Sequence, residues 1–184
     1  MTTVEQYANF ILPVAAKGVE PITVVSAKGR TVTGDDGKQY LDCFSGISVV
    51  NAGHGHPKIL AAAHEQMQQL VHACSYVYHV PSVGALAEKL AEVTPGKLKK
   101  SFFGNSGAEA IEGAMRLAKQ ATGRRELVAL GYSFHGRTIG TLSITGNMAR
   151  KKNNGPYLSG VGFGPTPYCY RCPFKLEYPS CDLA

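Results

Sequence analysis

The stretch GNSGAEAIEGAMRLAK at positions 104–119 constrains the fold more than any other part of the sequence. Apolar residues recur in it at helical spacing, and a glycine-containing polar turn separates them from the short apolar run at 100–103. We therefore predict a strand over 100–103, a turn, and a helix over 107–121. Unpaired N–H groups and the helix dipole favour an anion at such a helix N-terminus.

Two interpretations of this turn remain open. Gly104 and Gly107 would let a phosphate approach the backbone without meeting a Cβ atom. Ser106 and Glu109 also have the spacing of a capping box, which satisfies the helix start without a ligand. An unrelated nucleotide-binding βαβ protein is disfavoured, because the turn lacks both the lysine of a P-loop and the third glycine of a dinucleotide fingerprint.

A second apolar strand is predicted over 126–130 and ends at Gly131. Strand, helix and strand form a βαβ unit, so we expect the sheet to be at least partly parallel. Ligands in such sheets lie beyond the carboxyl ends of the strands. The loops 104–107 and 131–138 should therefore be neighbours.

The first fifty residues show an extended pattern, with strands expected over 22–25, 30–33 and 39–41 and a turn at 35–37. This predicts a small β meander. A helix should begin at Pro57, and a second should cover 82–93 with Ser82 as its N-cap and 95–96 as its stop.

Composition excludes several classes of function. No apolar run in the 184 residues approaches a membrane span, and the N-terminus does not resemble a signal peptide, so a cytoplasmic location is expected. The net charge is +6, but the basic clusters at 97–100 and 150–152 have no interleaved aromatic residues and read as solvated surface. We therefore expect neither nucleic-acid nor membrane binding.

The loop at 131–138 gathers groups that suit an aromatic, anionic ligand. Phe134 could stack on a planar ring, and Arg137 could bind a carboxylate through two hydrogen bonds. His135 lies between them and favours a site, although its role is open. A phosphate, a ring and a carboxylate would each have a partner here.

Four motifs then occur in order along the chain: LDCFSGI at 41–47, NAGHGHP at 51–57, NSGAEA at 105–110 and FHGRT at 134–138. With these motifs the sequence resembles the class III pyridoxal-phosphate-dependent aminotransferases of fold type I. Within that class it is most similar to the ω-aminotransferase branch, and in particular to 4-aminobutyrate aminotransferase.

The resemblance implies that pyridoxal 5'-phosphate is the cofactor. Ser106, Gly107 and Ala108 would hold its phosphate, Phe134 would stack on its ring, and His135 would lie beside it. Ala108 is a departure, since many members have Ser or Thr there. Backbone N–H groups can still bind the phosphate.

The resemblance also implies a substrate site. Arg137 would bind a substrate carboxylate, while Ser45, Gly46, Ile47 and Tyr78 would line the substrate entrance. The substrates would be an ω-amino acid and a 2-oxo acid, and the active site would form at the interface of a homodimer. The racemases and decarboxylases that share these motifs remain alternatives, because the reaction depends on how the breaking bond is aligned with the cofactor ring.

The implied fold is α/β. Residues 1–56, with the meander, would contribute to the small domain, and residues 57–184 would be the first part of the cofactor-binding large domain, with a mixed, mostly parallel sheet and a cysteine-rich loop at 165–184. No lysine of this chain stands where the family's Schiff-base lysine is expected, and we place that residue beyond 184. We accordingly interpret the chain as the N-terminal part of the enzyme. A non-catalytic module that binds a phosphate-bearing ligand or a partner subunit is the alternative.

Two smaller patterns allow metal binding. Cys169, Cys172 and Cys181 have knuckle-like spacing, but only three ligands are visible, and a structural or redox-active loop is favoured. His54 and His56 flank one glycine and are interpreted as turn and helix-entry residues. No metal site is therefore predicted, and five cysteines without a signal peptide argue against a disulfide framework.

Overall fold

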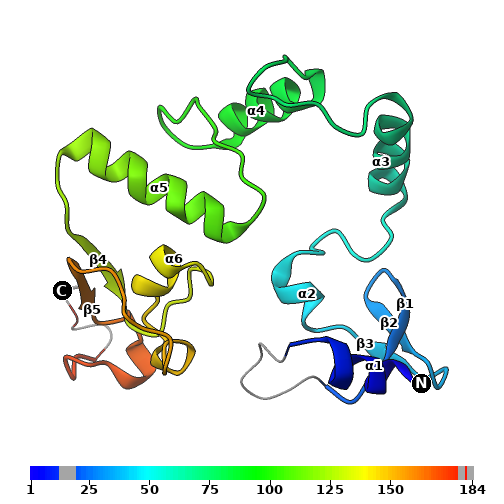
Figure 1. Ribbon diagram of the computed structural model, residues 1–184, viewed down its shortest axis with the longest axis horizontal. Helices are drawn as coiled ribbons and strands as arrows, with labels where there is room; N and C mark the ends of the chain where they lie inside the picture. Colours follow the sequence, from blue (N-terminus) through cyan, green and yellow to red (C-terminus); the bar gives the residue numbers. More distant parts are fainter. Residues whose placement is uncertain (13–19, 178–180, 182–184) are drawn as a thin grey trace. The chain divides into compact units, whose positions relative to one another are not determined.

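The computed structural model of the protein describes residues 1–12, 20–177 and 181. It consists of two compact units, Met1–Lys89 and Leu90–Ala184. The first holds an antiparallel sheet and the second a parallel one, which confirms the expected mixed α/β class (Figure 1). The predicted domain boundary between 56 and 57 stays a prediction.

The first unit contains the predicted meander. Strands β1 (Val24–Lys28), β2 (Thr31–Gly34) and β3 (Gln39–Leu41) pair in chain order, all antiparallel. The turn between β2 and β3 is closed by Gly37, whose φ of 76° is easily reached only by glycine and whose N–H donates to the Gly34 carbonyl. The first strand begins later than predicted, because its ladder starts at the Val24–Gly34 pair.

The helices α1 (Thr3–Phe10) and α3 (Pro57–Gln69) lie in this unit, and α4 (Pro81–Val93) runs across its boundary at Lys89. The segment α2 (Ser45–Ser48) is a single turn of left-handed backbone and not a regular α-helix. The prediction of extended structure at the N-terminus was wrong: the Thr2 hydroxyl and the Glu5 carboxylate form a reciprocal capping box that starts α1. Helix α3 begins at Pro57 as predicted. Ser82 is not an N-cap, because Pro81 already occupies the first turn and the Val80 carbonyl accepts hydrogen bonds from the residues after it.

The second unit is built from α5 (Gly107–Thr122), β4 (Leu127–Leu130), α6 (Ile139–Ser143) and β5 (Val161–Gly164), with single 3-10 turns at Met148–Arg150 and Cys169–Arg171. Strands β4 and β5 are parallel, with Leu127 opposite Val161 and Leu130 opposite Gly164. Helices α5 and α6 are in contact. The left-handed residue Gly123 ends α5.

The prediction of a strand at 100–103 was wrong. A strand needs a neighbouring strand for its ladder hydrogen bonds, and none pairs with this segment among the described residues. It is held by a side chain instead, since a Cβ on Gly113 of α5 would lie 2.8 Å from the Phe102 ring. The parallel pair is therefore β4 with β5, and α6 lies between them in the chain.

Hydroxyl groups occupy much of the buried space of the second unit. Thr141 and Thr145 are fully buried and Ser143 nearly so, beside the buried apolar side chains of Ala129 and Ile144. The hydroxyls of Ser143 and Thr145 donate to the carbonyls four residues earlier, at 2.6 and 2.8 Å, so burial leaves them satisfied. By contrast, many large apolar side chains are exposed, including Ile59, Leu60 and Met67 of α3.

No helix in the described ranges is long and apolar enough to cross a membrane.

Candidate functional site

At the N-terminus of α5, only the Ser106 half of the predicted capping box is formed. Ser106 has extended backbone angles, and its hydroxyl accepts the N–H of Glu109 at 3.1 Å. The predicted capping box is incomplete, because the Glu109 carboxylate accepts the N–H of Asn105 at 2.5 Å and not that of Ser106. The carboxylate thereby fixes the turn that enters the helix.

This cap leaves donors free in the first turn. The backbone N–H groups of Gly107 and Ala108 have no hydrogen-bond partner among the residues that the structure describes. A Cβ on Gly107 would meet nothing within 4 Å, so the backbone is accessible there. The positive end of α5 thus keeps two amide donors without partners, which suits an anion.

The loop at 131–138 follows β4 and has a fixed shape. The Ser133 hydroxyl donates to the Leu130 carbonyl at 2.6 Å and accepts the N–H of Gly146 at 3.1 Å. The N–H of His135 donates to the buried Thr145 hydroxyl at 3.2 Å. These bonds tie the loop to the segment after α6, so Phe134 is presented from a supported backbone.

This loop touches the first turn of α5. A Cβ on Gly136 would lie only 2.7 Å from the Ala108 Cβ and 2.7 Å from the Thr141 hydroxyl oxygen. The loops 104–107 and 131–138 are therefore neighbours, as predicted, although the contact does not come from two adjacent strands.

A hollow of about 460 Å³ lies where the two loops meet. Phe134 is about half exposed, and the guanidinium carbon of Arg137 lies 5.9 Å from its ring centroid. All five residues predicted to bind cofactor, together with Arg137, line this one hollow, whose full lining is Ser106, Gly107, Ala108, Ile111, Phe134, His135, Gly136 and Arg137.

A second guanidinium reaches the same ring and was missed from the sequence. The guanidinium carbon of Arg150 lies 5.7 Å from the Phe134 centroid. Its neighbour Lys151 is buried, so the interpretation of 150–152 as solvated surface was wrong at this residue. The signal available in the sequence was the pair of aromatic residues that follow, Tyr157 and Phe163, whose centroids lie 4.6 and 4.8 Å from the Lys151 Nζ atom.

The other predicted substrate residues belong to the first unit. Ser45, Gly46 and Ile47 form a turn of left-handed backbone, with φ values of 51°, 60° and 63°. Tyr78 lies between α3 and α4, is 65% exposed, and donates its N–H to the Cys74 carbonyl.

The cysteine-rich loop forms a hollow of its own. Cys169, Cys172 and Cys181 line a space of about 350 Å³ together with prolines and aromatic residues. In the part of the chain that the structure describes, no group of three histidine, cysteine or acidic residues is arranged to hold a metal ion.

Comparison with known proteins decides the family. The family model described as "Aminotransferase class-III" matches residues 14–181, nearly the whole chain. The chain belongs to the class III aminotransferases.

The relatives of this class III aminotransferase chain carry names of different activities. The acetylornithine aminotransferase of Halalkalibacterium halodurans is 44% identical over 137 residues, which are 74% of this chain and 35% of that protein. The leucine/methionine racemase of Thermococcus litoralis is 36% identical over 180 residues, which are 98% of this chain and 41% of that protein. The chain thus spans well under half the length of these relatives.

Solved structures agree with the fold. An (S)-enantioselective omega-transaminase from Thermomicrobium roseum matches with a TM-score of 0.83 and 31% identity, over 91% of this chain and 40% of that one. An amine transaminase from an uncultivated Pseudomonas species, solved in its PLP-bound form, matches with a TM-score of 0.79 and 27% identity, over 90% of this chain and 40% of that one. The family evidence therefore points to pyridoxal 5'-phosphate.

Proposed function

We propose that the protein transfers an amino group from an ω-amino acid of the 4-aminobutyrate kind to a 2-oxo acid, with pyridoxal 5'-phosphate as cofactor. The observation that carries the proposal is the single hollow that the first turn of α5, the Phe134 ring and Arg137 line together. Because the chain belongs to the class III aminotransferases, we interpret this arrangement as a site for the cofactor and a substrate carboxylate. The activity belongs to the whole protein, of which this chain corresponds to part of the relatives' length.

The residues present fit the cofactor. The free N–H groups of Gly107 and Ala108, with the Ser106 hydroxyl, offer donors for a phosphate at the positive end of α5. Ala108 contributes no hydroxyl, so the backbone supplies its share of the binding. Phe134 offers an exposed aromatic face for the ring, and His135 lies beside it on a hydrogen-bonded loop.

When bound, pyridoxal 5'-phosphate supplies the electron sink that amino-group transfer needs. The chain's own residues would bind the cofactor and orient the substrate. Arg137 would hold a substrate carboxylate through two parallel hydrogen bonds, and its place over the Phe134 ring would put that carboxylate beside the cofactor. Ser45, Gly46, Ile47 and Tyr78 would line the substrate side.

A racemase is the second candidate, because the alignment with the leucine/methionine racemase covers 98% of this chain. Its reaction would use the same phosphate, ring and carboxylate contacts in this hollow, and the assays below distinguish the two activities. The proposal further includes a cytoplasmic homodimer with the active site at the subunit interface.

The experiment uses the protein expressed from its complete reading frame. Pyridoxal 5'-phosphate is titrated by absorbance, and 4-aminobutyrate, 5-aminovalerate and N-acetylornithine are each assayed with 2-oxoglutarate, beside leucine and methionine racemisation. Arg137→Lys should raise KM for the amino donor about 10- to 100-fold with little change in cofactor affinity, since a lysine cannot form the bidentate contact. The control is Arg124→Lys, at an exposed guanidinium just beyond α5 and outside the hollow.

Transfer from an ω-amino donor, with cofactor affinity weakened by Phe134→Leu, supports the proposal. Racemisation without transfer supports the second candidate. A protein that does not bind pyridoxal 5'-phosphate contradicts both. Borohydride reduction of the cofactor-loaded protein adds a separate check, because a single adduct at a lysine within 1–184 would overturn our placement of the Schiff-base lysine outside this stretch.

A further inference from the structure

Four consecutive residues of the first unit have left-handed backbone. The φ values of Ser45, Gly46, Ile47 and Ser48 are 51°, 60°, 63° and 60°. In this region the Cβ of an L-residue crowds the following carbonyl oxygen, and a β-branched residue such as Ile47 is an outlier there. The left-handed turn 45–48 therefore costs conformational free energy that other contacts must offset.

Burial of Ile47 does not offset that cost, because its side chain is 74% exposed. Hydrogen bonds close the turn instead: the N–H of Ser48 donates to the Phe44 carbonyl at 3.1 Å, and the N–H of Val49 donates to the Ser45 carbonyl at 2.8 Å. Strained backbone of this kind persists where its surroundings over-determine it, and it concentrates at ligand sites.

Asp42 holds the entrance of the turn. Its Oδ1 atom accepts the N–H groups of Phe44 and Ser45, both at 2.8 Å. The carboxylate thus fixes the direction in which the chain enters the left-handed region. The backbone N–H of Asp42 donates to the Arg30 carbonyl at 2.9 Å, which ties Asp42 to the turn of the β1–β2 hairpin.

His54 holds Asp42 from the other side. Its Nε2 atom lies 2.6 Å from the Asp42 Oδ2 atom, and the two side chains are only 23% and 11% exposed. The backbone of His54 is bridged to Gly29 by two hydrogen bonds of 2.8 Å, in the turn of the same hairpin. A Cβ on the preceding Gly53, whose φ is 88°, would lie 3.3 Å from the Gly29 backbone, so backbone conformation and space both favour glycine there.

We propose that Asp42 and His54 are positioning residues that hold the left-handed turn 45–48 in the form that meets the substrate. The substrate part rests on the proposed function, which places Ser45, Gly46 and Ile47 at the substrate entrance; the clamp itself rests on the contacts above. The sequence motifs at 41–47 and 51–57 thereby act together, because the second motif supplies the histidine that orients the carboxylate of the first.

The test measures hydrogen exchange and steady-state kinetics on the protein expressed from its complete reading frame. The variants are Asp42→Ala and His54→Ala, with His54→Gln as the conservative form that keeps a donor. Matched controls are Asp35→Ala and His64→Ala, at exposed residues outside this network.

Both alanine variants should make peptides spanning 43–50 exchange about tenfold faster or more, while peptides of β2, β3 and α5 keep their rates, since only the acceptors of two N–H groups are disturbed. KM for the amino donor should rise about tenfold with cofactor affinity unchanged, and His54→Gln should recover part of both effects. The controls should match the parent protein.

Unchanged exchange at 43–50 in both alanine variants would overturn the clamp. Faster exchange with an unchanged KM would overturn its role toward substrate. If the parent protein shows no amino transfer, the proposed function fails, while the exchange data still decide whether Asp42 and His54 hold the turn.

Discussion

The Thr138 hydroxyl donates a hydrogen bond to the Glu112 carboxylate at 2.5 Å, and this bond joins the loop that carries Phe134 to helix α5. Thr138 is also the N-cap of α6, where it exchanges hydrogen bonds with Thr141 at 3.1 and 3.2 Å. One hydroxyl therefore links the helix that would cradle the phosphate to the loop that would hold the cofactor ring.

Replacing Thr138 should loosen that link. Thr138→Val keeps the shape but removes both the cap and the bond to Glu112, and should lower the free energy of unfolding by about 1–2 kcal/mol. Thr138→Ser keeps the hydroxyl and should stay within about 0.5 kcal/mol of the parent protein. Urea denaturation followed by circular dichroism measures both. Equal stability of the two variants would show that the bond carries no net free energy.

Gly136→Ala tests the close approach of the loop to α5. The new Cβ would lie 2.7 Å from both the Ala108 Cβ and the Thr141 hydroxyl oxygen, on a residue whose φ is 141°. Overpacking and strain should together cost about 1–3 kcal/mol, and the widened gap should weaken pyridoxal 5'-phosphate binding. Both effects can be measured by thermal denaturation and by cofactor titration.

Gly84→Ala is the matched control, since Gly84 lies within α4 and its Cβ would meet nothing within 4 Å. Alanine there should stabilise the helix by about 0.5–1 kcal/mol. A Gly136→Ala protein as stable as the Gly84→Ala protein would contradict the close packing of the two loops.

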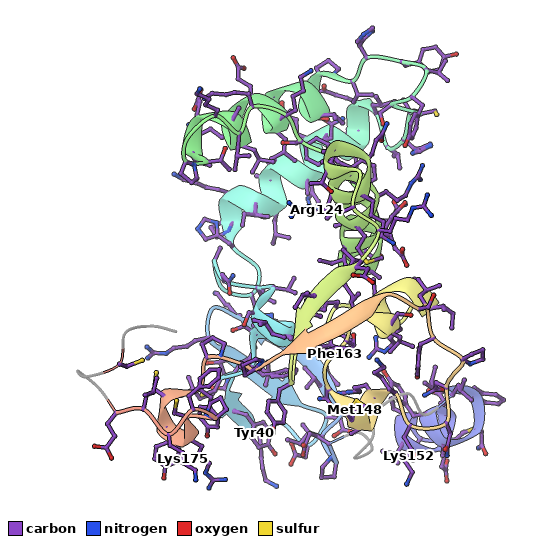
Figure 2. All side chains as sticks on the ribbon, turned by 90° about the vertical axis from the view of Figure 1, so that its left-hand side faces the viewer. Tyr40, Arg124, Met148, Lys152, Phe163 and Lys175 are labelled. Carbon is purple, nitrogen blue, oxygen red and sulfur yellow. The ribbon has the colours of Figure 1, made fainter. Side chains whose placement is uncertain are left out.

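Lys151→Met tests the buried ammonium. Lys151 Nζ donates to the Ser143 carbonyl at 3.1 Å and lies over the rings of Tyr157 and Phe163, the second of which is labelled on β5 in Figure 2. Methionine keeps the apolar stem but loses the charge and the donor, so the free energy of unfolding should fall by about 1–3 kcal/mol. Lys152→Met, at the exposed neighbour labelled in the same figure, should change it by less than about 0.5 kcal/mol. Similar losses in both variants would argue against a special role for Lys151.

Local signals explain which elements could be predicted from the sequence. The meander has a Gly37 turn, α3 has a proline at its start, and α5 has a serine cap and a glycine stop, all within a few residues of the element. The pairing of β4 with β5 joins residues more than thirty positions apart, which no local pattern indicates. For that reason a strand at 100–103 was expected beside β4 instead of β5. Helix α1 was missed although Thr2 and Glu5 have the spacing of a capping box, because the first fifty residues were interpreted together as extended structure.

The candidate site likewise contains residues that local motifs predicted and residues that only the structure reveals. Motifs at the start of α5 and in the loop after β4 named the residues that line the hollow, because each motif is continuous in the chain. Arg150 and Lys151 looked like solvated charge, since their positions depend on Phe134, Tyr157 and Phe163 in other segments. The contact between His54 and Asp42 was missed because the two residues are twelve positions apart in the sequence.

The last prediction concerns pH. A hydrogen bond from His54, and then the N–H groups of Ser45 and Phe44, lower the pKa of Asp42 to about 2. In the unfolded chain an aspartate has a pKa of about 3.9. Since the folded pKa is the lower one, ionised Asp42 stabilises the fold fully above the unfolded value, and this contribution is lost as the pH falls from about 4 toward 2.

Asp42→Asn should remove that pH dependence. The parent protein should be more stable than the variant at pH 5 and 6, and the difference should shrink steadily through pH 4 and 3, because the parent's carboxyl becomes protonated there while the amide does not titrate. His54→Gln keeps the carboxylate but loses the main cause of the lowered pKa, so its stability difference from Asp42→Asn should be smaller at pH 5. Urea midpoints at the four pH values measure all three proteins. Parallel stability curves for the parent and Asp42→Asn over this range would mean that the carboxylate contributes equally to the folded and unfolded states, and that the 2.6 Å contact with His54 does not favour its ionised form.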